Sequence, residues 1–303
     1  MSFIPDVATG SLRSGSPVLY ATLGELISER AGIINLGIEG SMLAGACAGI
    51  IATAETGNAY LGILAGCAAG GLLAVVHAFM AVTRGANQLA SGLALWFLGL
   101  GLTAFFGRPY VSANIDGLDR IALPGLSDLP VIGPVLFEHD VLTYTVIPLA
   151  IAIWFVLFRT RWGIHLRAVG EYPEAAFAAG INPQLVQYLA VCAGGALAGI
   201  GGAQLSLGLA QSWVEGMTNG RGFIAVALVI FAMWNPLRAV AGALLFGGVL
   251  AMQLQLQARG VAVSPFLLEM TPYLVTLAVL LFWNRASRHA MPEGLRAVFR
   301  GTG

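Results

Sequence analysis

The chain alternates between long apolar stretches and short segments that carry its charged residues. Six stretches contain no acidic or basic side chain apart from histidine: 56–83, 85–107, 141–158, 222–237, 239–258 and 270–284. Most of them reach the length of about 20 residues that a helix needs to cross a hydrocarbon core of about 30 Å. The pattern therefore predicts an all-α protein that crosses a membrane several times.

The apolar pattern predicts about nine spans. We place them at 16–30, 38–55, 59–82, 87–107, 141–158, 185–208, 222–235, 238–256 and 266–284. The first span is short, and Glu25 interrupts it. We expect one transmembrane domain over residues 1–303, with a cytoplasmic loop at 159–184 and an extracytoplasmic loop at 108–140.

Composition supports a membrane protein. Hydrophobic residues make up 57% of the chain and charged residues 10%, whereas about a quarter of a soluble domain is charged. Glycine accounts for 40 of 303 residues, and small residues let helices in a membrane approach one another closely. Glycine-rich stretches such as 194–202 are therefore predicted to be helix-packing faces.

All 15 basic residues are arginine. Without lysine the chain cannot contain a lysine-bearing phosphate-binding loop, so we expect it to carry no conventional ATPase of its own. Arginines gather at 159–184 and after residue 284, and the positive-inside rule places both segments in the cytoplasm. The acidic loop at 108–140 and the N-terminus then lie outside, and the stretch 28–37 lies near the cytoplasmic side.

Two apolar segments resemble each other: 61–74, "LGILAGCAAGGLLA", and 237–251, "LRAVAGALLFGGVLA". On the predicted topology they run in opposite directions. Inverted repeats of this kind are typical of transporters, in which the substrate path lies at the interface of the repeats. The alternative is a chance recurrence of small residues in apolar helices.

The stretch "SERAGIINLGIEG" (28–40) places charges and an amide among three glycines. Glycines weaken a helix, and a break in a membrane helix is tolerated only where it is buried in protein or lines water. For Asn35 and Glu39 we expect a path-lining or helix-capping role. For Glu29 and Arg30 the simpler interpretation is a helix end at the membrane interface. Glu25 lies on the same helix face as Glu29.

Residues 23–46, "LGELISERAGIINLGIEGSMLAGA", closely resemble the opening of the membrane permeases of bacterial ATP-binding cassette (ABC) importers. The nearest branch of that family handles simple sugars and nucleosides, and the permeases for ribose and branched-chain amino acids are more distant. Three further blocks agree in order: "RTRWGIHLRAVGEYPEAAFAAGI" (159–181), "GRGFIAVALVIFAMWNP" (220–236) and the glycine-rich span that follows it. The chain departs from the family near Ala232 and Met233, where glycine is usual, and it lacks the extra leading span of larger members.

The block at 159–181 also has a physical interpretation. Pro173 is suited to begin a helix and Glu174 to its positive end, and Gly180 is placed to end it. The resemblance implies that this is the coupling helix, which docks on the ATPase. It assigns that role to Arg167, Gly170, Glu171, Pro173, Glu174, Ala175, Ala176, Phe177 and Gly180. The alternative is an ordinary cytoplasmic loop.

The resemblance implies a permease subunit of an ATP-driven importer in the bacterial inner membrane. ATP and magnesium would bind to a partner ATPase, and this chain would bind no cofactor, metal or nucleic acid. A second permease, for which we favour a larger paralogue over a second copy, and a soluble or lipid-anchored substrate-binding protein would complete the importer. Polar candidates for the substrate path are Glu25, Asn35, Glu39, Asn87, Gln88, Trp96 and Asn219. Trp96 could stack on a sugar or base, although packing is the favoured interpretation of a lone aromatic in a span.

Other functions stay open at this point. An ion-coupled secondary transporter fits an inverted repeat, and a branched-chain amino acid permease fits the wider family. A membrane hydrolase is disfavoured, since neither G-x-S-x-G nor H-E-x-x-H occurs. His77 is interpreted as a hydrogen-bonded helix contact, and Cys47, Cys67 and Cys192 as small core residues.

Overall fold

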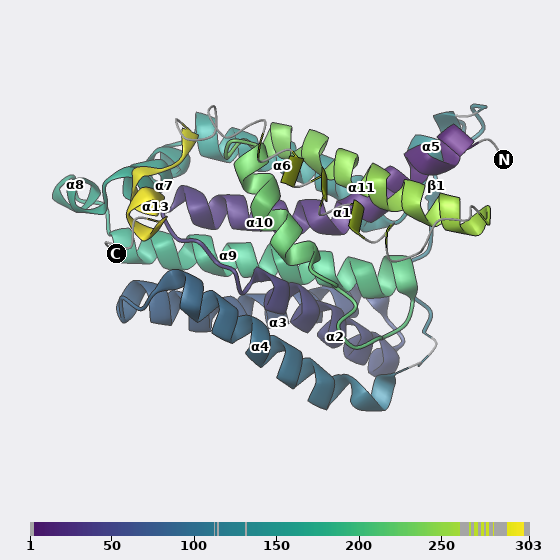
Figure 1. Cartoon of the computed structure of the whole chain (residues 1–303), viewed down its shortest axis with the longest axis horizontal. Coiled ribbons are helices and arrows are strands. Elements are labelled where there is room, and N and C mark those ends of the chain that lie inside the picture. Colours follow the sequence, from purple (N-terminus) through teal and green to yellow (C-terminus); the bar gives the residue numbers. More distant parts are fainter. Residues whose placement is uncertain are drawn as a thin grey trace.

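Long helices laid along one axis, with short elements at both ends, make up the computed structural model of the chain (Figure 1). It describes residues 3–111, 113, 115–130, 132–260 and 290–299, together with residues 267, 270–271, 274–275, 277–278 and 281. The long helices are α1 (Phe3–Arg30), α2 (Ile38–Thr56), α3 (Ala59–Ala78), α4 (Gln88–Gly107), α6 (Val141–Arg159), α9 (Pro183–Gln204) and α11 (Pro236–Ala258).

The two ends of the bundle carry different short elements (Figure 1). One end, here called the outer end, holds α5 (Ile132–Leu136) and the antiparallel pair β1 (Ile121–Ala122) and β2 (Glu138–His139). The opposite, inner end holds α7 (Arg161–Glu171), α8 (Pro173–Ala178) and α13 (Glu293–Phe299). Helix α1 begins at the outer end and ends at the inner end, as the predicted topology requires.

Three of the long helices continue, at their C-terminal ends, into a short π-helix or 3₁₀ turn. α3 continues as the π-helix η1 (Phe79–Thr83), α9 as the π-helix η3 (Leu205–Ala210), and α4 as the 3₁₀ turn η2 (Arg108–Tyr110). The described residues contain five helical stretches that are long and apolar enough to cross a membrane: Ala59–Thr83, Gln88–Tyr110, Val141–Arg159, Pro183–Ala210 and Pro236–Ala258.

The structure corrects two predicted spans. The helix placed at 16–30 begins at Phe3, so α1 has 28 residues. The span placed at 222–235 is α10 (Arg221–Phe231), whose 11 residues reach only about 16 Å at 1.5 Å per residue. Left-handed backbone at Gly220, before it, and at Met233 and Trp234, after it, limits the helix. The span predicted at 266–284 lies mostly outside the described residues.

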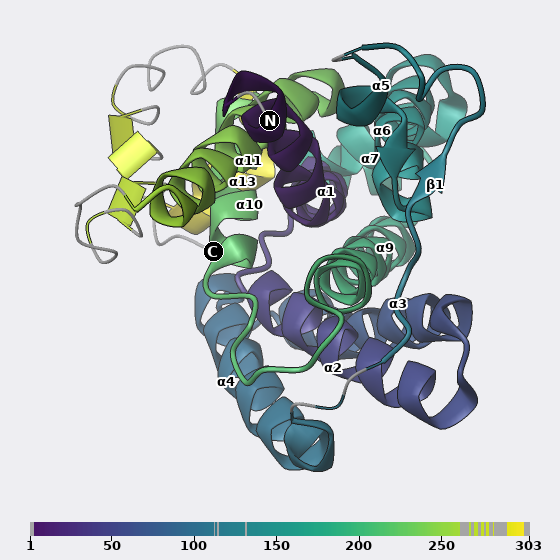
Figure 2. The ribbon, with the colours of Figure 1, turned by 90° about the vertical axis from the view of Figure 1, so that its right-hand side faces the viewer.

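Helix α9 lies in the middle of the bundle, between α1 on one side and α2 and α3 on the other (Figure 2). Glycines stand at the positions where the α9 backbone comes closest to the backbones of its neighbours. A Cβ on Gly199 would collide with the carbonyl oxygen of Gly66 on α3, and one on Gly194 would meet the backbone of Gly24 on α1. Close backbone packing by small residues is therefore confirmed for the stretch 194–202.

The pairing of α1 with α11 repeats this glycine contact. A Cβ on Gly247 of α11 would collide with the backbone of Ser11 and Gly15 on α1. α3 packs on α9 and α11 packs on α1, and α3 begins at the outer end where α11 finishes. The two segments that resemble each other in sequence thus lie in α3 and α11, which run in opposite directions.

Candidate functional site

The break between α1 and α2 is lined by polar side chains that take up its backbone groups. The N–H of Asn35 donates to Glu25 Oε1 at 2.7 Å, and the N–H of Ile34 donates to Gln88 Oε1 at 2.9 Å. The carbonyl of Ile34 lies 3.0 Å from His77 Nε2. Since lipid cannot satisfy these groups, Glu25, Gln88 and His77 make the break possible. The interpretation of His77 as a helix contact is confirmed.

Asn35 and Glu39 shape the start of α2. The Asn35 side chain accepts the N–H of Gly37 at 2.9 Å, which closes a turn of the kind that asparagine favours. Glu39 is 3% exposed and lies in the first turn of α2, where the helix dipole stabilises an anion. Of the two roles expected for these residues, helix capping is the one for which the structure gives direct contacts.

The Glu39 carboxylate also caps the start of α10. One oxygen accepts the N–H of Gly220 at 2.8 Å and the hydroxyl of Thr218 at 2.7 Å, and the other accepts the N–H of Gly222 at 2.5 Å. The N-termini of two broken helices therefore meet at one carboxylate inside the bundle. Thr218 and Gly222 gave no sequence signal, because their partner lies about 180 residues away.

At the end of α1, Glu29 and Arg30 hold Trp234. The indole N–H of Trp234 donates to Glu29 Oε2 at 2.6 Å, and Arg30 donates to the Trp234 carbonyl at 3.0 and 3.1 Å. Arg30 ends the helix as expected, and the Glu29 side chain beside it is only 1% exposed because it packs inside the protein. The position of the pair at the membrane interface stays a prediction. Trp234 is fully buried and follows α10.

The backbone next to this contact is strained. Met233 and Trp234 have φ values of 50° and 54°, in the left-handed region that side chains with a Cβ disfavour by roughly 1–2 kcal/mol per residue. Ala232, in contrast, has φ of −71°. A glycine near this position, as in the resembling family, would adopt the left-handed conformation without this strain.

Arg30 connects this turn to the inner loop. Its guanidinium lies 5.6 Å from the centre of the Phe158 ring, and Arg167 of α7 lies 5.2 Å from the same ring. A Cβ on Gly170 would collide with the Arg30 carbonyl, so glycine is needed where α7 crosses the end of α1. Arg167 and Gly170 thus link α7 to α1.

The short helix predicted at 173–179 is present as α8, and it presents one large side chain to solvent. Phe177 is 71% exposed, whereas Ala176 is 3% exposed. Glu174 and Ala175 are exposed, and Gly180 follows the helix with φ of 83°. Ala176 therefore packs within the chain rather than on a docking surface. A cavity of about 470 Å³ beside α8 is lined by Pro173, Glu174, Phe177, Asn182, Pro183 and Gln184.

The other path candidates occupy separate places. Asn87 caps α4 by accepting the N–H of Ala90 at 3.0 Å. Trp96 packs against Phe97 and Phe223, with ring centres 4.7 and 5.1 Å apart, which favours its packing role. Asn219 is exposed and left-handed in the turn before α10. The structure thus brings Glu25, Asn35, Gln88 and Glu39 to the break and leaves Asn87 outside it.

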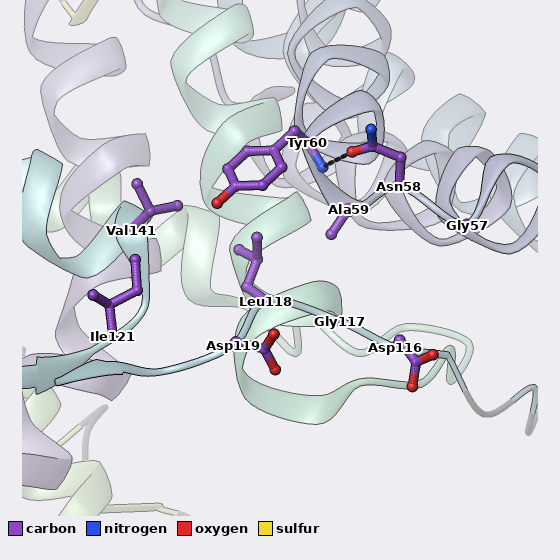
Figure 3. A pocket seen from close by; sticks show the side chains of 10 residues that line it. All are labelled: Gly57, Asn58, Ala59, Tyr60, Asp116, Gly117, Leu118, Asp119, Ile121 and Val141. Atoms are coloured by element: carbon purple, nitrogen blue, oxygen red, sulfur yellow. Dashed lines mark hydrogen bonds between the residues drawn. The ribbon is translucent and has the colours of Figure 1, made fainter.

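Two cavities open at the outer end. One, of about 350 Å³, lies beside β1 (Figure 3). Asp116 and Asp119 line it from the segment that leads to the strand, and Tyr60 lines it from the start of α3. The second, of about 480 Å³, lies between α1, η3 and α11. Among the described residues, no three His, Cys, Asp or Glu side chains form a group that could hold a metal ion.

Sequence comparison extends over almost the whole chain. Residues 7–283 match the family described as branched-chain amino acid transport system, permease component. The putative glucose ABC transporter permease protein TsgC13 of Haloferax volcanii is 42% identical over 97% of this chain and 97% of its own length. No solved structure matches the chain.

Relatives from two bacteria are also similar. The guanosine ABC transporter permease protein NupQ of Bacillus subtilis is 35% identical over 80% of this chain and 79% of its own length. The nucleoside ABC transporter permease protein NupC of Lactococcus lactis is 34% identical over 92% of this chain and 93% of its own length. A second guanosine permease of Bacillus subtilis, NupP, is 24% identical over 79% of this chain and 71% of its own length.

Proposed function

The chain belongs to the family of branched-chain amino acid transport system permease components, and we propose that it is the transmembrane subunit of an ATP-driven importer. It is a multi-pass membrane protein and a transport subunit, not an enzyme. The observation that carries the proposal is the similarity to ABC permeases across nearly the full length of the chain, at 42% identity over 97% of its residues.

We propose a nucleoside or a simple sugar as the transported solute. The relatives that share 34–42% identity with the chain are named for glucose, guanosine and nucleosides. The family description names branched-chain amino acids, and a permease for these is the alternative. An ion-coupled secondary transporter has no support among the relatives.

Hydrolysis of ATP would take place on a partner subunit that docks on α8. The exposed Phe177 beside a cavity is suited to such a contact, because buried aromatic anchors dominate the energetics of protein interfaces. Movement of α8 and α7 would reach α1 through the contact of Gly170 with Arg30 and the stacking of Arg167 and Arg30 on Phe158. ATP and magnesium would stay on the partner.

Two further partners complete the proposed importer. A second permease subunit would enclose the path together with this chain, and the similarity of the chain to both NupQ and NupP of one organism supports a paralogue in that place. A soluble or lipid-anchored binding protein would deliver the solute to the outer end. The location would be the bacterial inner membrane.

We also propose that the two halves of the chain form an inverted repeat. Three features support this. α3 and α11 run in opposite directions, and each packs closely on one long helix, α3 on α9 and α11 on α1. The N-termini of α2 and α10 also meet at Glu39. In transporters built this way, the solute passes where the broken helices meet. The glutamate cap at Glu39 would then close the path in the present state.

The test is uptake into proteoliposomes that contain the chain, its co-encoded permease and ATPase, and the binding protein. We expect accumulation of a nucleoside or a sugar that requires ATP and the binding protein and persists when ion gradients are collapsed. Accumulation by the chain alone, driven by an ion gradient, would contradict the proposal. A panel of purine nucleosides, pentoses, hexoses and branched-chain amino acids identifies the solute.

A further inference from the structure

The cavity between α1, η3 and α11, here called the outer cavity, is lined by side chains of two kinds. Polar groups come from three helices, Asp6, Arg13 and Ser14 from α1, Arg221 from α10 and Gln255 from α11. Its volume of about 480 Å³ is in the range of about 300–1,000 Å³ that is common for sites of small organic ligands. The cavity is large enough for a molecule of one or two rings.

Several of these polar groups are available to a ligand. Among the described residues, the side chains of Arg13, Ser14 and Gln255 make no hydrogen bond or ion pair. Arg221, in contrast, donates to the carbonyls of Met217 and Thr218. Guanidinium, hydroxyl and amide groups together can both donate and accept hydrogen bonds, as recognition of a solute with several hydroxyl groups requires.

The remaining wall of the outer cavity is apolar. Leu205 and Leu209 of η3, Met217 before α10, and Leu254 of α11 line it. Two guanidinium groups and one carboxylate give the wall an excess of positive charge, which disfavours a cation. A ring with an apolar face and a hydroxyl-bearing edge fits this combination. That is the chemistry of a nucleoside or a pyranose sugar.

The inner side of the outer cavity adjoins the meeting point of the broken helices. Met217 and Arg221 line the cavity, and between them Thr218 and Gly220 donate to the Glu39 carboxylate. A solute in the cavity would therefore lie against the backbone segment that Glu39 holds. Release of that segment would be the next step inward.

We propose that the outer cavity binds the solute before it passes Glu39, with Arg13, Ser14 and Gln255 as its hydrogen-bonding partners. The proposal rests on the proposed import function. It adds a place for the solute within this chain and a ligand of stated chemistry, an uncharged ring compound with several hydroxyl groups.

Protection from a thiol reagent tests this inference in the complete importer. Cys47, Cys67 and Cys192 are replaced by alanine, and one new cysteine is introduced, either Ala210→Cys, at an exposed position in the outer cavity, or Asp119→Cys in the cavity beside β1 (Figure 3). We expect a millimolar nucleoside or hexose to slow labelling of Ala210→Cys by a membrane-impermeant maleimide at least fivefold and to leave the labelling of Asp119→Cys unchanged. The two solutes are tested separately.

A matched pair on α11 tests the hydrogen-bonding role. Gln255 lines the outer cavity, whereas Gln257 is exposed and does not line it. Added to Ala210→Cys, Gln255→Leu should raise the solute concentration for half-protection about tenfold, and Gln257→Leu should not. Equal effects of the two variants would overturn the assignment of Gln255.

The outcomes separate the two proposals. If ATP-dependent uptake occurs but neither solute protects Ala210→Cys, or both cysteines are protected equally, the outer cavity is not the binding site and the import function stands. If no ATP-dependent uptake of any solute occurs, the import function is overturned, and the outer cavity as its solute site with it.

Discussion

The Glu39 carboxylate on the first turn of α2 accepts the backbone N–H of Gly222 on the first turn of α10 at 2.5 Å. This contact joins two segments that are 183 residues apart. It occupies the second oxygen of a side chain whose first oxygen already accepts two hydrogen bonds. The same carboxylate therefore caps the start of α10 while it belongs to the first turn of α2.

Replacing Glu39 by glutamine should destabilise the protein by about 2–4 kcal/mol, since hydrogen bonds to charged groups contribute about 1.5–3 kcal/mol each. The side-chain amide of glutamine would turn its NH₂ group, itself a donor, toward the donors of either Gly222 or Thr218 and Gly220. Glu25→Gln is the matched control, because only Oε1 of that buried glutamate accepts a hydrogen bond from a described residue. Unfolding in detergent measures both variants. A similar loss for Glu25→Gln would contradict the capping argument.

Met233→Gly should stabilise the protein by about 1 kcal/mol, since glycine adopts the left-handed conformation without strain and loses part of that gain through its flexible unfolded state. The neighbouring Ala232→Gly serves as control. Ala232 is buried with φ of −71°, so its replacement should destabilise. Thermal unfolding of the two variants should shift in opposite directions; a shift in the same direction would contradict the strain argument.

Phe177→Ala should weaken binding of the partner ATPase at least about tenfold, since loss of an aromatic anchor at an interface costs about 2 kcal/mol or more. Leu185→Ala is the control, because Leu185 is also exposed, at 56%, but lies on α9. Co-purification of the ATPase and ATP-dependent uptake provide the readouts. Ala176 is unsuitable here because its burial makes any large substitution a test of folding.

Gly199→Val should prevent the packing of α9 on α3 and destabilise the protein by on the order of 3 kcal/mol. Gly101→Val on α4 is the control, since a Cβ there would meet nothing within 4 Å. The fraction of protein that elutes as a single species in detergent should fall for Gly199→Val alone. Equal behaviour of the two variants would show that the close contact is dispensable.

Lowering the pH below about 6.5 should loosen the outer end at His139. Burial lowers the pKa of His139, and its Nε2 lies 2.8 Å from the Val135 carbonyl while Nδ1 has no partner among the described residues. The neutral ring is therefore the form that the fold favours. Its stabilising effect is full above the unfolded pKa of about 6.5 and declines as pH falls through the folded pKa.

Hydrogen exchange of residues 132–145 at pH 7.5 and pH 5.5, corrected for intrinsic rates, measures this effect. Protection should drop at the lower pH in the native protein. His139→Gln can keep the hydrogen bond to Val135 without a group that titrates in this range, and it should show the same protection at both values. An equal drop in that variant would assign the effect to another group.

Much of the helical framework could be predicted from the sequence, because charge-free runs such as 141–158 coincide with α6. The length of α10 could not. The run 222–237 carries no charge, but the helix ends within it at a left-handed turn whose Trp234 is held by Glu29 and Arg30, some 205 residues away. Local pattern does not contain that information.

The candidate site was predictable in part for the same reason. Glu25, Asn35 and Glu39 stood out as polar residues beside glycines, which is a local signal. Their partners Gln88, Thr218 and Trp234 depend on contacts across the fold. A path-lining role for Glu39 stays a prediction, whereas its capping role follows from three hydrogen bonds.

The glycine contacts of α9 with α3 and of α11 with α1 place backbone directly against backbone, with no side chain between the helices at these points. Helices that meet in this way can shear past each other without changes of rotamer, whereas interdigitated packing allows only discrete jumps. A displacement of α7 and α8 at the inner end would thus be transmitted as a small shift of whole helices along their axes.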